Sequence, residues 1–160
     1  MMDKNKVEAG GLIYKDHIGM VGLIAIPTHP GIGGRYFSEL ADAGIHVELI
    51  VNLYDGDKYD HILVCVDRNH LEAAVAITEK IHKEVDSHAV IHDDQVALVC
   101  ISSLDFDESQ VIAGHMFRAL GDSGINIQGI STSVSSVTCM ISSQDLDKAL
   151  TVLRQAFILP

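Results

Sequence analysis

The sequence is poor in basic residues, with 11 lysines and arginines against 22 aspartates and glutamates and a formal net charge of −11. Proteins that bind nucleic acids or anionic membranes need clustered lysine and arginine side chains to neutralise phosphates. Because the basic residues here are scattered among the acidic ones, we expect no nucleic-acid partner and no membrane partner. The excess of acid instead favours solubility.

Long apolar segments and a cysteine framework are also missing. No apolar run approaches the ~18 residues needed to cross a bilayer, and residues 1–6 are polar with no apolar signal region after them. We therefore expect a cytoplasmic protein. The three cysteines, Cys65, Cys100 and Cys139, lie far apart within apolar runs. This pattern is typical of buried, reduced thiols and not of a disulfide framework.

What the sequence does contain is an internal repeat and, with 48% hydrophobic residues, enough apolar surface for a core. Three pairs of similar segments carry the repeat: 37–50 with 117–130 at an offset of 80, 71–77 with 146–152 at an offset of 75, and 21–26 with 96–101, also at an offset of 75. Because the offset changes only in expected loops, the pattern predicts two copies of one fold.

Each copy is predicted to contain a strand, a helix, two strands and a second helix. Short apolar runs predict the strands, and apolar residues at helical spacing predict the helices. Gly44 and Gly124 are typical helix stops. In the first copy we expect strands at 21–26, 47–53 and 61–66 and helices at 33–43 and 69–85. In the second copy we expect strands at 96–101, 127–133 and 136–141 and helices at 108–120 and 144–156.

A fourth strand is needed to complete each sheet, and its position decides how the two copies are connected. Residues 88–94 can supply it in the first copy, but the second copy ends with only 157–159 available. A spare segment, 7–16, lies at the amino terminus. We therefore predict an α+β protein of two ferredoxin-like βαββαβ units. The first unit (17–94) is expected to be inserted into the second unit (7–16 plus 95–160).

Four segments together resemble the tandem ACT-domain regulatory region of aspartate kinases, over nearly the whole chain. They are IPTHPGIGGRYFSELADAGIHVELI (26–50), VIHDDQVALV (90–99), GINIQGISTS (124–133) and ALTVLRQAFIL (149–159). The kinase signature of Lys-Phe-Gly-Gly type is absent from the sequence. The resemblance therefore implies a regulatory protein without a catalytic domain or a cofactor. It also implies a homodimer, a free amino acid as effector and an aspartate kinase catalytic chain as partner.

The loop IPTHPGIGG invites comparison with phosphate-binding loops. No Gly-Lys-Ser/Thr follows it, and Tyr36 stands where a dinucleotide motif has its third glycine, so neither nucleotide motif is present. The glycines are typical of a tightly packed strand-to-helix turn, in which Pro30 fixes φ. A helix start also exposes unpaired N–H groups, which favour an anion such as the carboxylate of an amino acid.

The resemblance implies an effector site between the first unit of one chain and the second unit of its partner. The residues that it implies for effector binding are Thr28, His29, Pro30, Gly31, Ile32, Gly33, Gly34, Asn52, Asn126 and Ile127. No catalytic or metal-binding residues are implied.

Two positions depart from the family pattern: Thr28 stands where the family commonly has an acid, and Asn52 where it often has glutamine. An acid would pair with the effector's ammonium group, and losing that charge-assisted hydrogen bond lowers affinity about ten- to a hundredfold. Three alternatives stay open: a sensor of lysine or threonine type, a ligand-free ACT dimerisation module, and a small metal- or metabolite-binding protein. The metal alternative depends on His82, His88, His92, Asp93 and Asp94, which are close in sequence.

Overall fold

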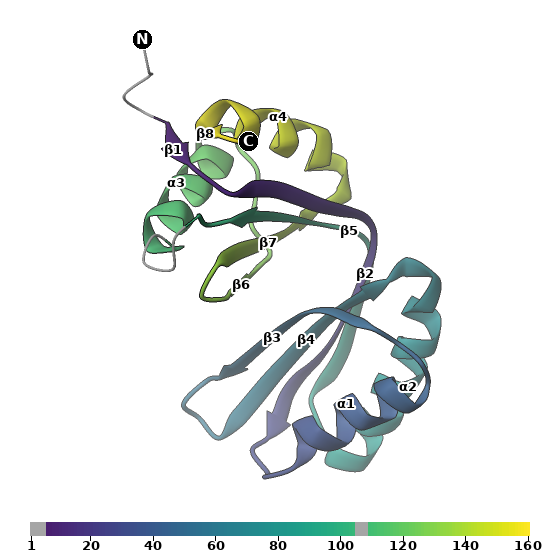
Figure 1. The fold of residues 1–160 in the computed structure, drawn as a ribbon. Helices are drawn as coiled ribbons and strands as arrows, with labels where there is room; N and C mark the ends of the chain where they lie inside the picture. The colour runs from purple at the N-terminus through teal and green to yellow at the C-terminus, as the bar shows by residue number, and fades with distance from the viewer. Residues whose placement is uncertain (1–5, 105–108) are drawn as a thin grey trace. The chain divides into compact units, whose positions relative to one another are not determined.

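A computed structural model describes residues 6–104 and 109–160, and they form an α+β fold of two compact units. The first unit comprises residues 17–94, and the second comprises the described parts of 1–16 and 95–160. The chain begins in the second unit, builds the first and returns (Figure 1). The predicted ferredoxin-like architecture, with the first unit inserted into the second, is confirmed.

The first unit is a sheet with strand order β3-β4-β2-β5, covered on one face by two helices (Figure 1). Its elements are β2 (Gly11–Pro27), α1 (Ile32–Asp42), β3 (Val47–Tyr54), β4 (Tyr59–Asp67), α2 (Leu71–Val85) and β5 (Ala89–Ser102). The helices and the sheet enclose one apolar cluster, which contains Val21, Leu23, Ile26, Tyr36, Leu40, Ile45, Ile62, Val64, Val66, Leu71, Ala74 and Ile81.

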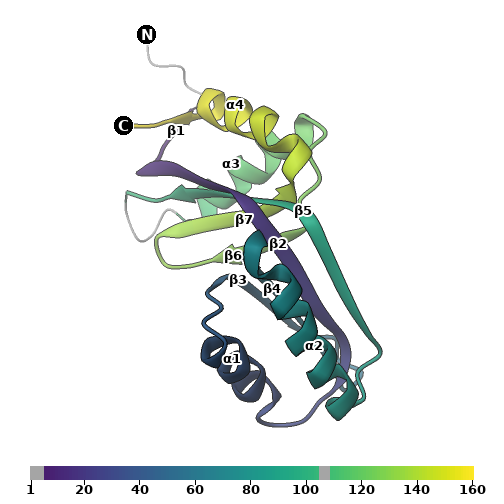
Figure 2. The same cartoon turned by 90° about the vertical axis from the view of Figure 1, so that its right-hand side faces the viewer.

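The second unit repeats this plan with the other ends of β2 and β5, in strand order β2-β5-β7-β6 (Figure 2). Its own elements are α3 (Ser109–Asp122), β6 (Gly129–Thr132), β7 (Ser136–Ser142) and α4 (Leu146–Ala156), together with the parallel pair β1 (Val7–Glu8) and β8 (Phe157–Ile158). The predicted start of α3 at Glu108 lies outside the described residues.

The amino-terminal segment joins the core of the second unit. Ala9 is 2% exposed and belongs to the same apolar cluster as the residues of α3 and α4. Its N–H donates to the carbonyl of Ile158 at 3.0 Å, and the N–H of Gly10 donates to the carbonyl of Ser102 at 2.8 Å. Residues from both ends of the chain therefore complete one unit, and the first unit is built entirely from the sequence between them.

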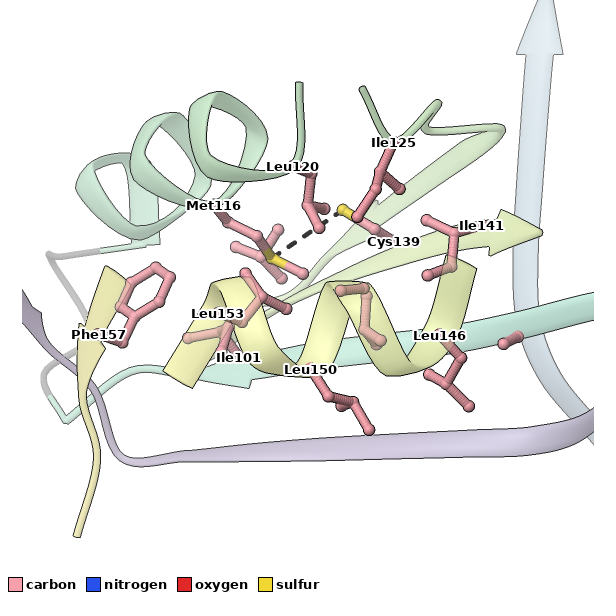
Figure 3. Packing of buried hydrophobic residues seen from close by; sticks show 14 of the residues in the cluster. Ile101, Met116, Leu120, Ile125, Cys139, Ile141, Leu146, Leu150, Leu153 and Phe157 are labelled. Carbon is pink, nitrogen blue, oxygen red and sulfur yellow. Dashed lines mark hydrogen bonds between the residues drawn. The ribbon is translucent and has the colours of Figure 1, made fainter. Parts of the chain in front are cut away.

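The core of the second unit is built from α3, α4, β5, β7 and β8 (Figure 3). The Sγ atom of Cys139 lies 4.0 Å from the Sδ atom of Met116, the contact that the dashed line marks. Burial raises the pKa of Cys139 to about 12, and that of Cys65 in the first unit likewise to about 12. Both side chains are fully buried and neither forms a disulfide, as the sequence predicts, whereas Cys100 is only partly buried.

Both units end their first helix in the same way. Gly44 (φ 71°) and Gly124 (φ 73°) follow α1 and α3 in the left-handed conformation. In each case the glycine N–H and the N–H of the next residue, Ile45 or Ile125, bond back to the last turn of the helix. This is the Schellman arrangement, which glycine favours because it has no Cβ to clash. The two predicted helix stops are confirmed.

Strand continuity and register differ from expectation. β2 and β5 are single strands of 17 and 14 residues, each of which we had expected as two shorter strands. No turn interrupts either run, and the one irregularity, between Leu23 and Ile26 near the end of β2, does not end the strand. Ile18 pairs with Asp67, and Val96 pairs with Ser142. Because Asp67 and Ser142 are equivalent at the offset of 75 that also relates the following helices, Ile18 and Val96 are equivalent at an offset of 78. The alignment of 21–26 with 96–101 is therefore wrong, because consecutive apolar residues do not fix a register.

No helix in the described part of the chain is long and apolar enough to cross a membrane.

Candidate functional site

The loop between β2 and α1 turns through a glycine. The N–H of Thr28 donates to the carbonyl of Lys58 at 2.8 Å, which fixes the end of β2. Gly31 is the N-cap of α1 and has a φ of +97°, a backbone conformation that residues with a Cβ rarely adopt. The ring Nδ1 of His29 lies 2.8 Å from the carbonyl oxygen of Pro30. Because a carbonyl can only accept, this nitrogen carries the proton.

The start of α1 has no side-chain cap among the residues that the structure describes, and no acidic residue lies in its first turn. The first N–H groups of a helix have no partner within the helix, and together with the helix dipole they attract an anion. A Cβ added at Gly33 or Gly34 would meet no atom within 4 Å. The tight packing expected of these two glycines is therefore wrong, and open space lies beside the helix start.

A cavity of about 260 Å³ joins this loop to the sheet of the first unit. We call it the Asn52 cavity, and its lining residues are Ile26, His29, Gly31, Ile32, Gly33, Phe37, Asn52, Asp60 and Ile62. Asn52 on β3 lies opposite Ile62 on β4. Asp60 is two residues before Ile62 on the same strand, and alternation places it on the same face of the sheet. An amide and a carboxylate therefore face a largely apolar space.

A second cavity, of about 510 Å³, opens beside the same loop. We call it the Arg35 cavity, and it is lined by Pro27, Thr28, His29, Pro30, Gly31, Ile32, Arg35, Glu84 and Val85. The guanidinium of Arg35 forms an ion pair with Glu84, and its Nε lies 3.6 Å from Glu39. The hydrogen bond from Lys80 to Glu39, 2.9 Å long, lowers the pKa of Glu39. The charges of this cavity are therefore already paired with each other.

The predicted site residues fall into separate groups. The Asn52 cavity brings together His29, Gly31, Ile32, Gly33 and Asn52, whereas Thr28 and Pro30 line only the Arg35 cavity. Gly34 lines neither of these two cavities. Asn126 and Ile127 belong to the second unit, between α3 and β6, where Asn126 is exposed and Ile127 packs against the apolar cluster.

Sequence reasoning overlooked Asp60. The signal was available in the alternation of β4, where Ile62, Val64 and Val66 are buried under the helices. Extending that alternation backwards by two residues places Asp60 on the face that carries the core. The strand expected from the sequence begins at residue 61 and so excludes Asp60, whereas the structure shows that β4 already begins at Tyr59.

His61 holds the end of β2 against the hairpin. Its Nδ1 accepts a hydrogen bond of 3.3 Å from the N–H of Ala25, which has a positive φ of 49° within an irregularity between Leu23 and Ile26. Its Nε2 lies 3.5 Å from Asp55. Hydrogen bonds from the backbone N–H groups of Asp57 and Tyr59 and from His61 lower the pKa of Asp55. These contacts fix the strand that leads into the loop.

The histidines suggested as metal ligands are dispersed. Nδ1 of His82 lies 2.6 Å from the hydroxyl of Ser87, and His92 lies with Asp93 and Asp94 in a different surface pocket. Over residues 6–104 and 109–160, no group of three or more histidine, cysteine or acidic side chains is placed to hold a metal ion.

Comparison with known proteins supports the architecture. Residues 105–157 match the family model described as ACT domain. The chain is 29% identical over 158 residues to an aspartokinase from Thermus thermophilus, covering 98% of this chain and 38% of that protein. It is 30% identical over 147 residues to an aspartate kinase from Pseudomonas fluorescens, covering 92% of this chain and 36% of that protein. The chain thus spans little more than a third of the length of these relatives.

Two solved structures are similar over almost their full length. The ligand-free regulatory subunit of aspartate kinase from Thermus thermophilus has a TM-score of 0.85 and 27% identity, with 94% of this chain and 99% of that chain covered. A structure of aspartokinase alpha and beta subunits has a TM-score of 0.83 and 25% identity, with 92% of this chain and 97% of that chain covered. The similarity includes both units.

Proposed function

This chain is a tandem ACT-domain protein of the kind that forms the regulatory region of aspartate kinases, and we propose that it senses a free amino acid through the Asn52 cavity. The expected effector is of the lysine or threonine type. The two ACT units take up the described residues, which leaves no room among them for a kinase domain. We propose that its role is regulatory and that it acts by binding the effector.

The observation that carries the proposal is the convergence of the open start of α1 with Asn52 and Asp60 on one small cavity. At about 260 Å³ it is below the 300–1,000 Å³ typical of drug-sized sites, which suits a single amino acid. The N–H groups at the helix start favour the effector's carboxylate. The Asn52 amide can both donate and accept, so it can orient the ligand.

Regulation would follow from a shift between two subunit arrangements. An effector changes an equilibrium only by as much as it binds one state better than the other. We propose that it is held by the first unit of one chain and contacted by Asn126 and Ile127 of the partner subunit. The arrangement that brings these groups to the effector would then be favoured when it is bound.

The test is thermal unfolding of the purified chain with millimolar lysine, threonine or methionine. A ligand at 100 times its dissociation constant adds ~2.7 kcal/mol to the free energy of unfolding, so the effector should raise the melting temperature visibly. A rise with one amino acid identifies the effector. Unchanged melting with all three contradicts the sensor and favours the ligand-free dimerisation module.

Two glycine variants then locate the site. Gly33 lines the Asn52 cavity and Gly34 does not, yet an added Cβ meets no atom within 4 Å at either position. Both Gly33→Ala and Gly34→Ala should fold and gain up to about 1 kcal/mol, because alanine is the better helix former. Only Gly33→Ala should weaken the effector-induced rise in melting temperature. Equal responses of the two variants would place the effector elsewhere.

We further propose a homodimer that uses the edge strand β3. This strand ends the sheet of the first unit and exposes three large apolar side chains: Ile50, Leu53 and Tyr54 are 45%, 59% and 54% exposed. Exposed apolar edge strands are templates for pairing with another chain. Leu53→Lys should shift the protein to monomer in analytical ultracentrifugation. Val111→Lys, at an exposed apolar position on α3, is the control.

An aspartate kinase catalytic chain is the proposed further partner. The similarity to a structure of alpha and beta subunits supports this assignment. Mixing this chain with such a catalytic chain should give a complex that elutes earlier than either component in size-exclusion chromatography. Separate elution at micromolar concentrations of both would contradict the partnership.

A further inference from the structure

We propose that Asp60 is the residue that binds the ammonium group of the effector. The inference rests on the proposed function, because it assigns a role within the Asn52 cavity. Asp60 lies beside Asn52, its carboxylate has no partner among the described residues, and the helix start offers the opposite polarity.

The strand register brings Asp60 close to Asn52. Asn52 lies opposite Ile62, so Asp60 is its diagonal neighbour on the adjacent strand. Diagonal neighbours on one face of an antiparallel pair lie about 7–8 Å apart, within reach of one small ligand. On its other side Asp60 is paired with Ile26 of β2, the strand that leads into the loop. The carboxylate is thus held on the sheet and not on a flexible segment.

Within the part of the chain that the structure describes, the Asp60 carboxylate has no countercharge. Over the described ranges 6–104 and 109–160, no hydrogen bond or ion pair joins it to another residue. Asp55, five residues earlier, accepts from two backbone N–H groups and lies 3.5 Å from His61. Asp55 is therefore used to build the hairpin, whereas Asp60 is not engaged in the fold.

The surroundings of Asp60 favour a bound cation. Asp60 is half-buried beside Ile26, Phe37 and Ile62 of the same cavity. An ionised carboxylate that is partly removed from water gains from pairing with a positive group. Arg35 does not supply one, because it lines the other cavity and is paired with Glu84. The imidazole of His29, the other titratable side chain in the cavity, is held by the carbonyl of Pro30.

The cavity therefore has two ends of opposite sign. The helix start attracts a carboxylate, and Asp60 attracts an ammonium group, with the Asn52 amide also lining the space. A free amino acid carries both charges. This polarity selects against ligands whose amino group is missing or acylated, and against simple anions, which Asp60 would repel.

The decisive variant is Asp60→Asn, which removes the charge and keeps the shape. Titration calorimetry with L-threonine and L-lysine should show affinity reduced about ten- to a hundredfold, the value of one charge-assisted hydrogen bond. Asp57→Asn is the matched control, because it removes the same charge from an exposed position in the same hairpin. Its affinity should equal that of the unsubstituted protein.

Analogues without the α-ammonium group provide a second measurement that needs no variant. The unsubstituted protein should bind L-threonine more tightly than 2,3-dihydroxybutyrate, and L-lysine more tightly than 6-aminohexanoate. In Asp60→Asn this difference should shrink. If Asp60→Asn does not fold by circular dichroism, Asp60→Ser replaces it, and the comparison in the unsubstituted protein still decides. Equal affinity for the amino acid and its analogue overturns the inference.

The two proposals can fail separately. Binding of neither amino acid by the unsubstituted protein overturns the proposed function, and the role of Asp60 with it. Binding that Asp60→Asn leaves unchanged overturns only the role of Asp60 and leaves the sensor in place. Equal losses in Asp60→Asn and Asp57→Asn would also overturn it, because the effect would then come from net charge.

Discussion

The two units share one fold, but their interiors differ at a pair of equivalent positions. In the first unit the hydroxyl of Tyr36 lies 2.6 Å from that of Thr78, and both residues are fully buried. The repeat places Met116 and Leu153 at these positions in the second unit, where they are buried in an apolar core. The fold therefore accommodates either a polar pair or an apolar pair at this contact between helices.

The same comparison shows how the second unit differs at the positions equivalent to those that line the Asn52 cavity. Thr132 lies opposite Val137 on β7, as Asn52 lies opposite Ile62 on β4. Two residues before Val137 the chain has Ser135, where the first unit has Asp60. The loop HPGIGG also has no counterpart in the sequence SLDFDESQ. A few polar residues and one glycine turn distinguish the units, and the apolar pattern that builds the fold is retained in both.

The largest expected effect tests whether the two cores are equally important. Leu40 and Leu120 are equivalent, fully buried and part of the same helix-end motif. Leu40→Ala and Leu120→Ala should each lower the free energy of unfolding by about 2–5 kcal/mol, because each leaves a cavity. Urea denaturation measures both. Val111→Ala, at an exposed site, is the control. A small cost at one leucine alone would show that its unit contributes little to stability.

The next effect concerns the buried hydroxyl pair. Thr78→Val leaves the Tyr36 hydroxyl without a partner and should cost about 1–3 kcal/mol, whereas Tyr36→Phe should cost only about 0.5–1.5 kcal/mol, because Thr78 still donates to the carbonyl of Ala74. The double variant should be more stable than Thr78→Val alone, since it removes both polar groups. Thermal denaturation of the three variants provides the measurement. Additive losses would contradict the interpretation that an apolar pair can replace this contact.

A smaller effect separates the shared glycines from the one found in the site loop. Gly44→Ala and Gly124→Ala should each cost about 1–2 kcal/mol, because a Cβ is strained at positive φ. Gly31→Ala should cost a similar amount, since its φ is +97°. Unlike the other two, Gly31→Ala should also abolish the effector-induced rise in melting temperature. A retained rise in that variant would show that the loop does not shape the site.

The smallest effect is a response of one hairpin to acid. The folded pKa of Asp55 is lowered, chiefly by the Asp57 N–H, so its contribution is present above the unfolded pKa near 3.8 and is lost as the pH falls through the lower folded value. Hydrogen exchange followed by NMR should show the amides of Asp57 and Tyr59 losing protection below about pH 4. The second hairpin, which pairs the hydroxyls of Ser133 and Ser136, should not respond. Asp55→Asn should remove the difference between the two hairpins.

Most of the fold could be predicted because its signals are local. Helical spacing, the stops at Gly44 and Gly124 and the burial of Cys65 and Cys139 are confirmed, whereas Cys100 is only partly buried. The alignment of 21–26 with 96–101 failed, because a strand of consecutive apolar residues looks alike in any register. The continuity of β2 and β5 was also missed, since a strand that passes from one unit into the next carries no mark in the sequence.

The candidate site was only partly foreseen, for a physical reason. The loop residues and Asn52 were identified, but Asp60 was not, and Thr28 lines a different cavity from Asn52. The departure at Thr28 suggested that the site lacks an acid. The structure places the carboxylate of Asp60, which has no partner among the described residues, in the same cavity as Asn52 and on the neighbouring strand. Which acid faces a ligand depends on pairing between strands, and a single sequence does not show that pairing directly.

The sequence by itself determined that there are two α+β units, where their helices end and which residues are buried, because periodicity and glycine act over a few neighbouring residues. Tertiary structure alone decided which polar groups meet. The start of α1, Asn52 and Asp60 come from three separate elements, and only the register of β3 and β4 and the packing of α1 over them bring those groups to one cavity.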